Sequence, residues 1–142
     1  MSENKKGKKE EIEDRVLVSD VFTSKVYKRE TKTVNGRFRL KDSLGIGIIN
    51  QILLKGDGND YTIQVIIDDA IMYNDPYSFF FTNSEHIDNV SAYLAAGVYY
   101  LTLQNISFQK SLIVRIITTT SIIFNLMLIR YAIRNEISQS ED

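Results

Sequence analysis

The sequence predicts an all-β protein, an antiparallel β-sandwich of the jelly-roll kind with about eight strands. Short apolar alternations separated by turn residues run from Val16 onward, and no long helical period competes with them. Isoleucine is frequent, and its branched Cβ suits the pleated surface of a strand. The chain of 142 residues is 44% hydrophobic and 25% charged, which is typical of one folded domain that buries a core.

Three parts are expected along the chain. Residues 1–15 form a flexible charged N-terminal arm, 16–136 the β-sandwich domain, and 137–142 a polar C-terminal tail. The arm alternates lysine and glutamate blocks that cannot bury apolar surface, so it is either a solvated tail or an arm that orders on a neighbouring subunit. It lacks the apolar stretch of a signal peptide, which indicates synthesis in the cytoplasm.

The first strands are expected at Val16–Phe22, Ser24–Val34 and Arg37–Leu40. Asn35-Gly36 tolerates the positive φ angles of a type I′ turn, so the second and third are predicted to form a β-hairpin. One face of this hairpin is charged throughout, which places it at a sheet edge or partly outside the core. An exposed edge also allows the 24–40 hairpin to pair with a neighbouring chain. The charged residues are Lys28, Glu30, Lys32, Arg37 and Arg39.

The middle of the chain predicts three more strands. Ile46–Leu54 is a nearly continuous apolar run that ends in the polar loop 55–60. Tyr61–Asp68 alternates with a period of two and turns tightly at Asp68-Asp69 into Ala70–Tyr73. The sequence Asn74-Asp75-Pro76 then interrupts the strand pattern.

The segment 77–94 is the least regular, and two interpretations remain for it. Ser84 caps a short helix that buries Ile87, Val90 and Leu94, or the segment is a long loop. Three further strands are expected after it, at 98–108, 111–118 and 122–133. The last two are apolar enough to suggest a membrane span, but Arg115, Asn125 and Arg130 interrupt them, which favours buried strands.

Composition excludes several kinds of chemistry. There is no cysteine, which rules out disulfides, cysteine-ligated zinc, iron–sulfur clusters and a thiol nucleophile. The net charge of −1 removes a whole-chain electrostatic reason to bind nucleic acid or an anionic membrane. The single histidine, His86, has no triad or ligand-pair spacing around it. No enzyme activity, cofactor, catalytic residue or metal ligand is therefore predicted.

Aspartates in the turns leave two alternatives open. The loop Asp57-Gly58-Asn59-Asp60 is rich in oxygen ligands suited to calcium, although it lacks the EF-hand spacing. The second alternative is general acid–base catalysis by pairs of these carboxylates. Aspartate is also a preferred turn residue, because its side chain bonds to the local backbone, so the turns themselves account for these residues as well. The turn aspartates are Asp57, Asp60, Asp68, Asp69 and Asp75.

Five aromatic residues lie within nine positions, more than a surface loop usually contains. They are Tyr73, Tyr77, Phe79, Phe80 and Phe81. Some are expected in the core, and those that are exposed are candidate anchors of a protein interface. Stacking on sugar rings would use the same residues, so a carbohydrate-binding or receptor-binding module is the alternative function.

Three segments resemble small β-sandwich structural proteins of viruses and bacteriophages. The first is Tyr61–Asp69, a strand that ends in an acidic turn. The second is Tyr99–Val114, which contains the sequence Phe108-Gln-Lys-Ser-Leu-Ile-Val. The third is Ile129–Ile133, a closing strand that carries a tyrosine. The resemblance covers residues 46–133 and departs from the pattern at Asp69, where those proteins carry glycine. It implies a virion subunit, such as a capsid decoration, spike, head–tail or baseplate protein, that forms homo-oligomers within a larger viral assembly.

Overall fold

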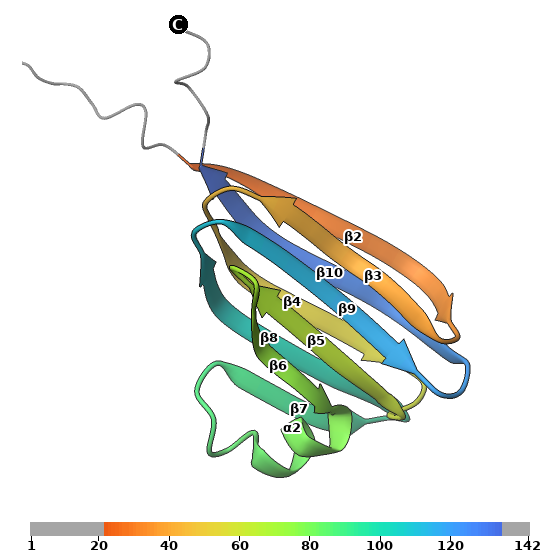
Figure 1. Ribbon diagram of the computed structural model, residues 1–142. Helices are drawn as coiled ribbons and strands as arrows, with labels where there is room; N and C mark the ends of the chain where they lie inside the picture. The colour runs from red at the N-terminus through yellow and green to blue at the C-terminus, as the bar shows by residue number, and fades with distance from the viewer. Residues whose placement is uncertain (1–21, 135–142) are drawn as a thin grey trace, which may run out of the picture.

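The computed structural model describes residues 22–134, which form nine β-strands and one short α-helix (Figure 1). The predicted arm, the C-terminal tail and nearly all of the predicted opening strand, 16–22, lie outside the described residues. The strands form two antiparallel sheets, so the prediction of an all-β sandwich is confirmed. No described helix is long and apolar enough to cross a membrane.

The two sheets contain five and four strands. The larger sheet has the order β2-β10-β4-β8-β7 and the smaller has the order β3-β9-β5-β6, which lies in front in Figure 1. The helix α2 joins the last strand of the smaller sheet to the edge of the larger one. The elements are β2 (Phe22–Val34), β3 (Arg37–Leu44), β4 (Gly47–Gly56), β5 (Tyr61–Ile67), β6 (Ala70–Pro76), α2 (Tyr77–Asn83), β7 (Val90–Ala95), β8 (Val98–Phe108), β9 (Ser111–Thr118) and β10 (Ile122–Arg134).

Eight of these strands have the strand order of a jelly roll. β2 pairs with β10, β3 with β9, β4 with β8, and β5 with β6, so each pair is nested inside the previous one along the chain. Successive pairs alternate between the two sheets, as they do when one long hairpin is rolled into a double-sheet structure. β7 is an additional strand that extends the larger sheet beyond β8.

The predicted hairpin at Asn35-Gly36 is wrong, because β2 and β3 belong to different sheets. Gly36 has a φ of +104°, but Asn35 is not in the left-handed region, so the turn is not type I′. Gly36 instead bonds to Thr118: its N–H donates to Thr118 Oγ1 at 2.8 Å, and the Thr118 N–H donates to its carbonyl at 2.7 Å. The turn thus carries the chain between sheets, and both strands lie at sheet edges, as expected.

Two true hairpins occur within the sheets. Asp68 and Asp69, with φ angles of 52° and 67°, connect β5 to β6 and confirm the predicted tight turn. Ala96 and Gly97, with φ angles of 51° and 78°, connect β7 to β8 in the same way. Both two-residue connections have the positive φ angles of type I′ turns, whose twist matches that of paired strands.

The helix lies earlier than either interpretation of the irregular segment allowed. It spans Tyr77–Asn83, and Ser84 is its C-terminal cap rather than its N-terminal one. Tyr77 and Phe80, three positions apart, face the core and account for the helix as an amphipathic turn. Val90 does become buried, but on the strand β7, while Leu94 on the same strand remains 48% exposed.

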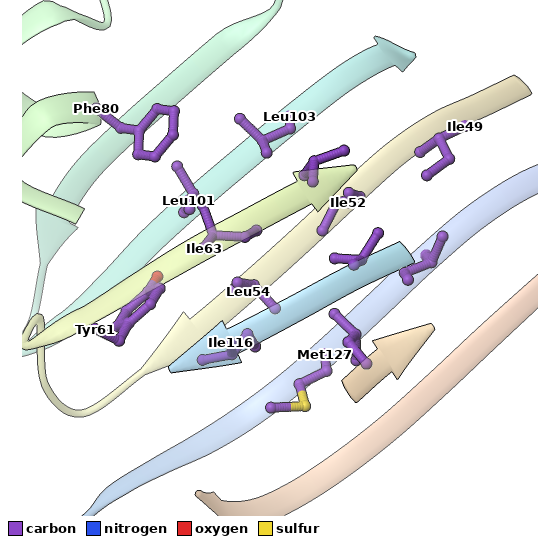
Figure 2. Packing of buried hydrophobic residues seen from close by; sticks show 14 of the residues in the cluster. Ile49, Ile52, Leu54, Tyr61, Ile63, Phe80, Leu101, Leu103, Ile116 and Met127 are labelled. Atoms are coloured by element: carbon purple, nitrogen blue, oxygen red, sulfur yellow. The ribbon is translucent and has the colours of Figure 1, made fainter. Parts of the chain in front are cut away.

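The core lies between the inward faces of the two sheets. Figure 2 shows Ile63 and Ile116 from the smaller sheet among Ile52, Leu54 and Leu101 of the larger one, all of them fully buried. The packing is close enough to require glycine at the start of β4. A Cβ on Gly47 would lie 2.6 Å from Phe108 Cζ, 2.7 Å from the Ala132 carbonyl oxygen and 2.9 Å from Ile133 Cδ1.

Candidate interaction surfaces

The five predicted aromatic residues divide between core and surface. Tyr77 and Phe80 are buried, with 1% and 0% of their surface exposed, and Tyr73 is half-buried against the core. Phe79 and Phe81 are 36% and 49% exposed. Of these residues, Phe79 and Phe81 are therefore the most accessible from solvent, while Tyr77 and Phe80 hold α2 in place.

Tyr77 attaches α2 to the larger sheet. Its ring packs at 5.6 Å from the ring of Tyr99 and 6.0 Å from that of Phe81, measured between centroids. Its hydroxyl lies 3.1 Å from the carbonyl oxygens of both Tyr93 and Tyr100 and donates to them. Burial, with the nearby Tyr99 and Tyr93, raises the pKa of Tyr77 to about 12, so the residue stays neutral and donating at physiological pH.

A cleft lies beside the exposed ring of Phe81, and we call it the α2 cleft. It has a volume of about 250 Å³ and is lined by four segments of the chain: Asn59, the α2 residues Tyr77, Ser78, Phe81 and Thr82, Leu94 on β7, and Tyr99 on β8. A second hollow of about 330 Å³ adjoins it, and Asn59 and Ser78 line both. Aromatic and polar side chains thus converge at the α2 end of the sandwich.

The turn aspartates hold loops together. The carboxylate of Asp68 accepts the backbone N–H groups of Gln109, Lys110 and Ser111, with the nearest nitrogen, that of Lys110, at 2.6 Å. The N–H of Ser111, followed by those of Gln109 and Lys110, lowers the pKa of this carboxyl group. This aspartate thereby fixes the connection from β8 to β9.

The loop considered for calcium is bonded to the strand beside it. Asp57 Oδ1 accepts the Ile123 N–H at 2.9 Å, and Asp60 Oδ2 accepts the Thr119 hydroxyl at 2.6 Å. Within residues 22–134, no group of three or more histidine, aspartate or glutamate side chains is placed to hold a metal ion. These hydrogen bonds give both carboxylates a structural role at the start of β10.

The outer face of the four-stranded sheet is unusually apolar. Ile66 on β5 pairs with Ile113 on β9 and with Ile71 on β6, so their side chains form one row across three strands. Ile117 extends the same face toward the α2 end. The inward neighbours Val65, Val114 and Ile116 are fully buried, so the isoleucines point outward, and Ile71 is 64% exposed. We call the four residues Ile66, Ile71, Ile113 and Ile117 the isoleucine face.

A polar row crosses the isoleucine face. Arg115 Nη1 donates to Gln64 Oε1 at 2.9 Å, and Gln64 Nε2 donates to Asn74 Oδ1 at 3.0 Å. Arg39 lies directly opposite Arg115 on the neighbouring strand and pairs with Asp42 at 3.1 Å, whereas Arg115 forms no ion pair with a described residue. Two arginines side by side with one carboxylate leave this part of the face positively charged.

Several residues of these surfaces escaped the sequence interpretation. Leu94 and Tyr99 line the α2 cleft because β7 pairs with β8, and the missed strand concealed this placement. The residues that carry the resemblance to virion proteins form β5, β8, part of β9 and the end of β10. No model of a known protein family matches this chain, and no curated protein matches its sequence.

Proposed function

We propose that this protein is a non-enzymatic structural subunit that packs against other protein subunits of a larger assembly, as a component of a virion. The capsid decoration, spike, head–tail and baseplate positions are all compatible with this role, and assembly would follow synthesis in the host cytoplasm. Jelly rolls build viral capsid proteins but also lectins and other proteins, so strand order alone does not carry the proposal.

The isoleucine face is the observation that carries it. An antiparallel sheet normally presents polar residues on the side that faces water, whereas Ile66, Ile71, Ile113 and Ile117 all point outward here. Four outward isoleucines therefore depart from the polar pattern of a water-facing sheet, even though a polar row crosses them. Exposed apolar surface of this kind marks an interaction site.

The charges on this face indicate what the covering surface carries. Arg115 is half-buried among the isoleucines, and among the residues that the structure describes it bonds only to the amide oxygen of Gln64, so its remaining N–H groups could pair with a carboxylate from a partner. The same face of a second copy would bring another arginine pair instead. We therefore expect the contact to join this face to a different, acidic surface of the neighbouring subunit, a head-to-tail geometry that gives a closed ring where the rotation closes and an open filament where it does not.

The test is the solution mass of the full-length protein by light scattering. We expect an oligomer that dissociates in the Ile71→Lys and Ile113→Lys variants. Ile123→Lys is the matched control, because Ile123 is 40% exposed on the other sheet and is expected to leave the mass unchanged. A protein that is monomeric both in solution and in its native particle would contradict the proposal.

A further inference from the structure

The α2 cleft combines an exposed aromatic ring with polar groups that have no partner. Phe81 and Leu94, which line it, are 49% and 48% exposed. The side chains of Ser78, Thr82 and Asn59 make no hydrogen bond to any described residue, although all three line the cleft. Ser78 and Thr82 are four positions apart on α2 and so lie on one face of it, next to Phe81.

This combination fits a sugar better than a purely apolar ligand. A pyranose ring has a C–H face that packs on an aromatic ring, and its hydroxyl groups both donate and accept hydrogen bonds. An asparagine amide and two hydroxyls offer donors and acceptors of both kinds in one small site. Apolar walls with a few convergent polar groups are the usual composition of a ligand site.

The charges around the cleft indicate a neutral sugar. Within residues 22–134, no lysine, arginine or histidine lines the cleft or the adjoining hollow, so a sialylated or sulfated glycan would find no described cation there to pair with its charge. Asp60, in the adjoining hollow, uses Oδ2 to accept the Thr119 hydroxyl and keeps Oδ1 for another donor. A carboxylate oxygen of this kind accepts sugar hydroxyls and repels anions.

We propose that the α2 cleft and the adjoining hollow bind a neutral oligosaccharide, with one sugar unit stacked on Phe81 and the next beside Asp60. Asn59 and Ser78 line both hollows and are placed to bond to both units. This binding activity goes beyond the proposed assembly role, although Ile117 of the isoleucine face also lines the adjoining hollow. The variants that test assembly, Ile71→Lys and Ile113→Lys, lie outside both hollows, and those that test glycan binding, Phe81→Ala and Asn59→Ala, lie outside the isoleucine face, so the two proposals can fail separately.

The experiment is a binding screen of the full-length protein against neutral, sialylated and sulfated oligosaccharides by saturation-transfer NMR. Each ligand found is then titrated against the wild type and variants. We expect a neutral oligosaccharide to bind, Phe81→Ala and Asn59→Ala each to weaken it about tenfold or more, and Phe81→Tyr to retain it. Phe79→Ala is the matched control, since Phe79 is an exposed phenylalanine of the same helix that does not line the cleft.

Three results would overturn this proposal. They are the absence of any neutral ligand, equal binding by the wild type and Phe81→Ala, and binding of anionic glycans alone. Denaturation midpoints of the variants separate lost binding from lost folding, and Asn59→Ala, on an exposed loop, provides a second readout if Phe81→Ala unfolds. A fall in oligomer mass in Phe81→Ala without glycan binding by the wild type would assign the cleft to a protein contact instead.

Discussion

The hydroxyl group of Tyr61 is buried without a hydrogen-bond partner among the described residues. The residue as a whole is 3% exposed. The ring itself is well packed, at 5.2 Å from the Phe124 ring and 5.7 Å from the Tyr77 ring between centroids (Figure 2 shows its place in the core). Phenylalanine at this position would keep the ring contacts and remove only the oxygen.

We therefore expect Tyr61→Phe to stabilise the protein. A buried polar group without a partner costs about 1 to 3 kcal/mol, and this is the gain expected in the free energy of unfolding. For a domain of this size, each kcal/mol corresponds to about 4 °C in the melting temperature. Urea denaturation followed by circular dichroism measures the gain directly, provided that the slope of the transition is unchanged.

Tyr77→Phe is the matched comparison, because it removes the same atom from a hydroxyl that does have partners. That hydroxyl donates to the carbonyl oxygens of Tyr93 and Tyr100, so its loss is expected to destabilise the protein by about 1 kcal/mol. The two Tyr→Phe variants should thus shift the midpoint in opposite directions. A loss of stability in Tyr61→Phe would contradict this expectation and mean that a water molecule bonds to the Tyr61 hydroxyl in solution.

Three further predictions follow from the same structure. Burial raises the pKa of Tyr61 and Tyr77 above the ordinary value of 10, so the unfolded chain loses these two protons at a lower pH than the folded protein does. The free energy of unfolding should therefore be unaffected by these groups below pH 10 and fall as the pH rises further, which urea midpoints measured from pH 8 to 11 check. Asp68→Asn should lower the midpoint at neutral pH and leave the two proteins more alike in acid, because the stabilisation by its carboxylate is present above the ordinary carboxyl pKa and is lost as the pH falls through its lowered one. Gly47→Ala should cost about 1 to 3 kcal/mol in urea denaturation because its Cβ would meet atoms within 3 Å, whereas Gly58→Ala, with no atom nearer than 3.4 Å, should change stability by less than about 0.5 kcal/mol.

Local patterns predicted those parts of the fold that depend on neighbouring residues. The period-two alternation of 61–67 placed β5, the apolar run 111–118 placed β9, and Asp68-Asp69 marked the turn between β5 and β6. Which strand pairs with which is not determined by neighbouring residues. Asn35-Gly36 signals a turn correctly, yet β2 pairs with β10, about one hundred residues away, because the nested pairing of the roll places β2 and β3 in different sheets.

The candidate surfaces were less accessible to prediction for a related reason. The helix α2 has the sequence YSFFFTN, and its aromatic residues favour strands as much as helices. Only the contacts of Tyr77 and Phe80 with the core select the helix. The isoleucine face was hidden differently, since Ile113 and Ile117 read as members of a buried strand and only the sheet shows that they point outward.

The position of α2 in the strand order explains why the residues of the proposed glycan site gather at this end. The nested pairs of the roll require β2 to β6 and β8 to β10, whereas 77–97, which contains α2 and β7, lies between the tip of the roll and β8. Its only strand adds to a sheet edge and pairs with one neighbour, so this segment can vary while the four nested pairs remain. It nonetheless supplies the exposed rings of Phe79 and Phe81 and most of the α2 cleft. A deletion that joins Pro76 to Val98 by a short turn should therefore separate glycan binding from assembly. Glycan binding would be lost, and the roll would be less stable because Tyr77 and Phe80 leave its core. Assembly through the isoleucine face, on the outer side of β5 and β9, would persist.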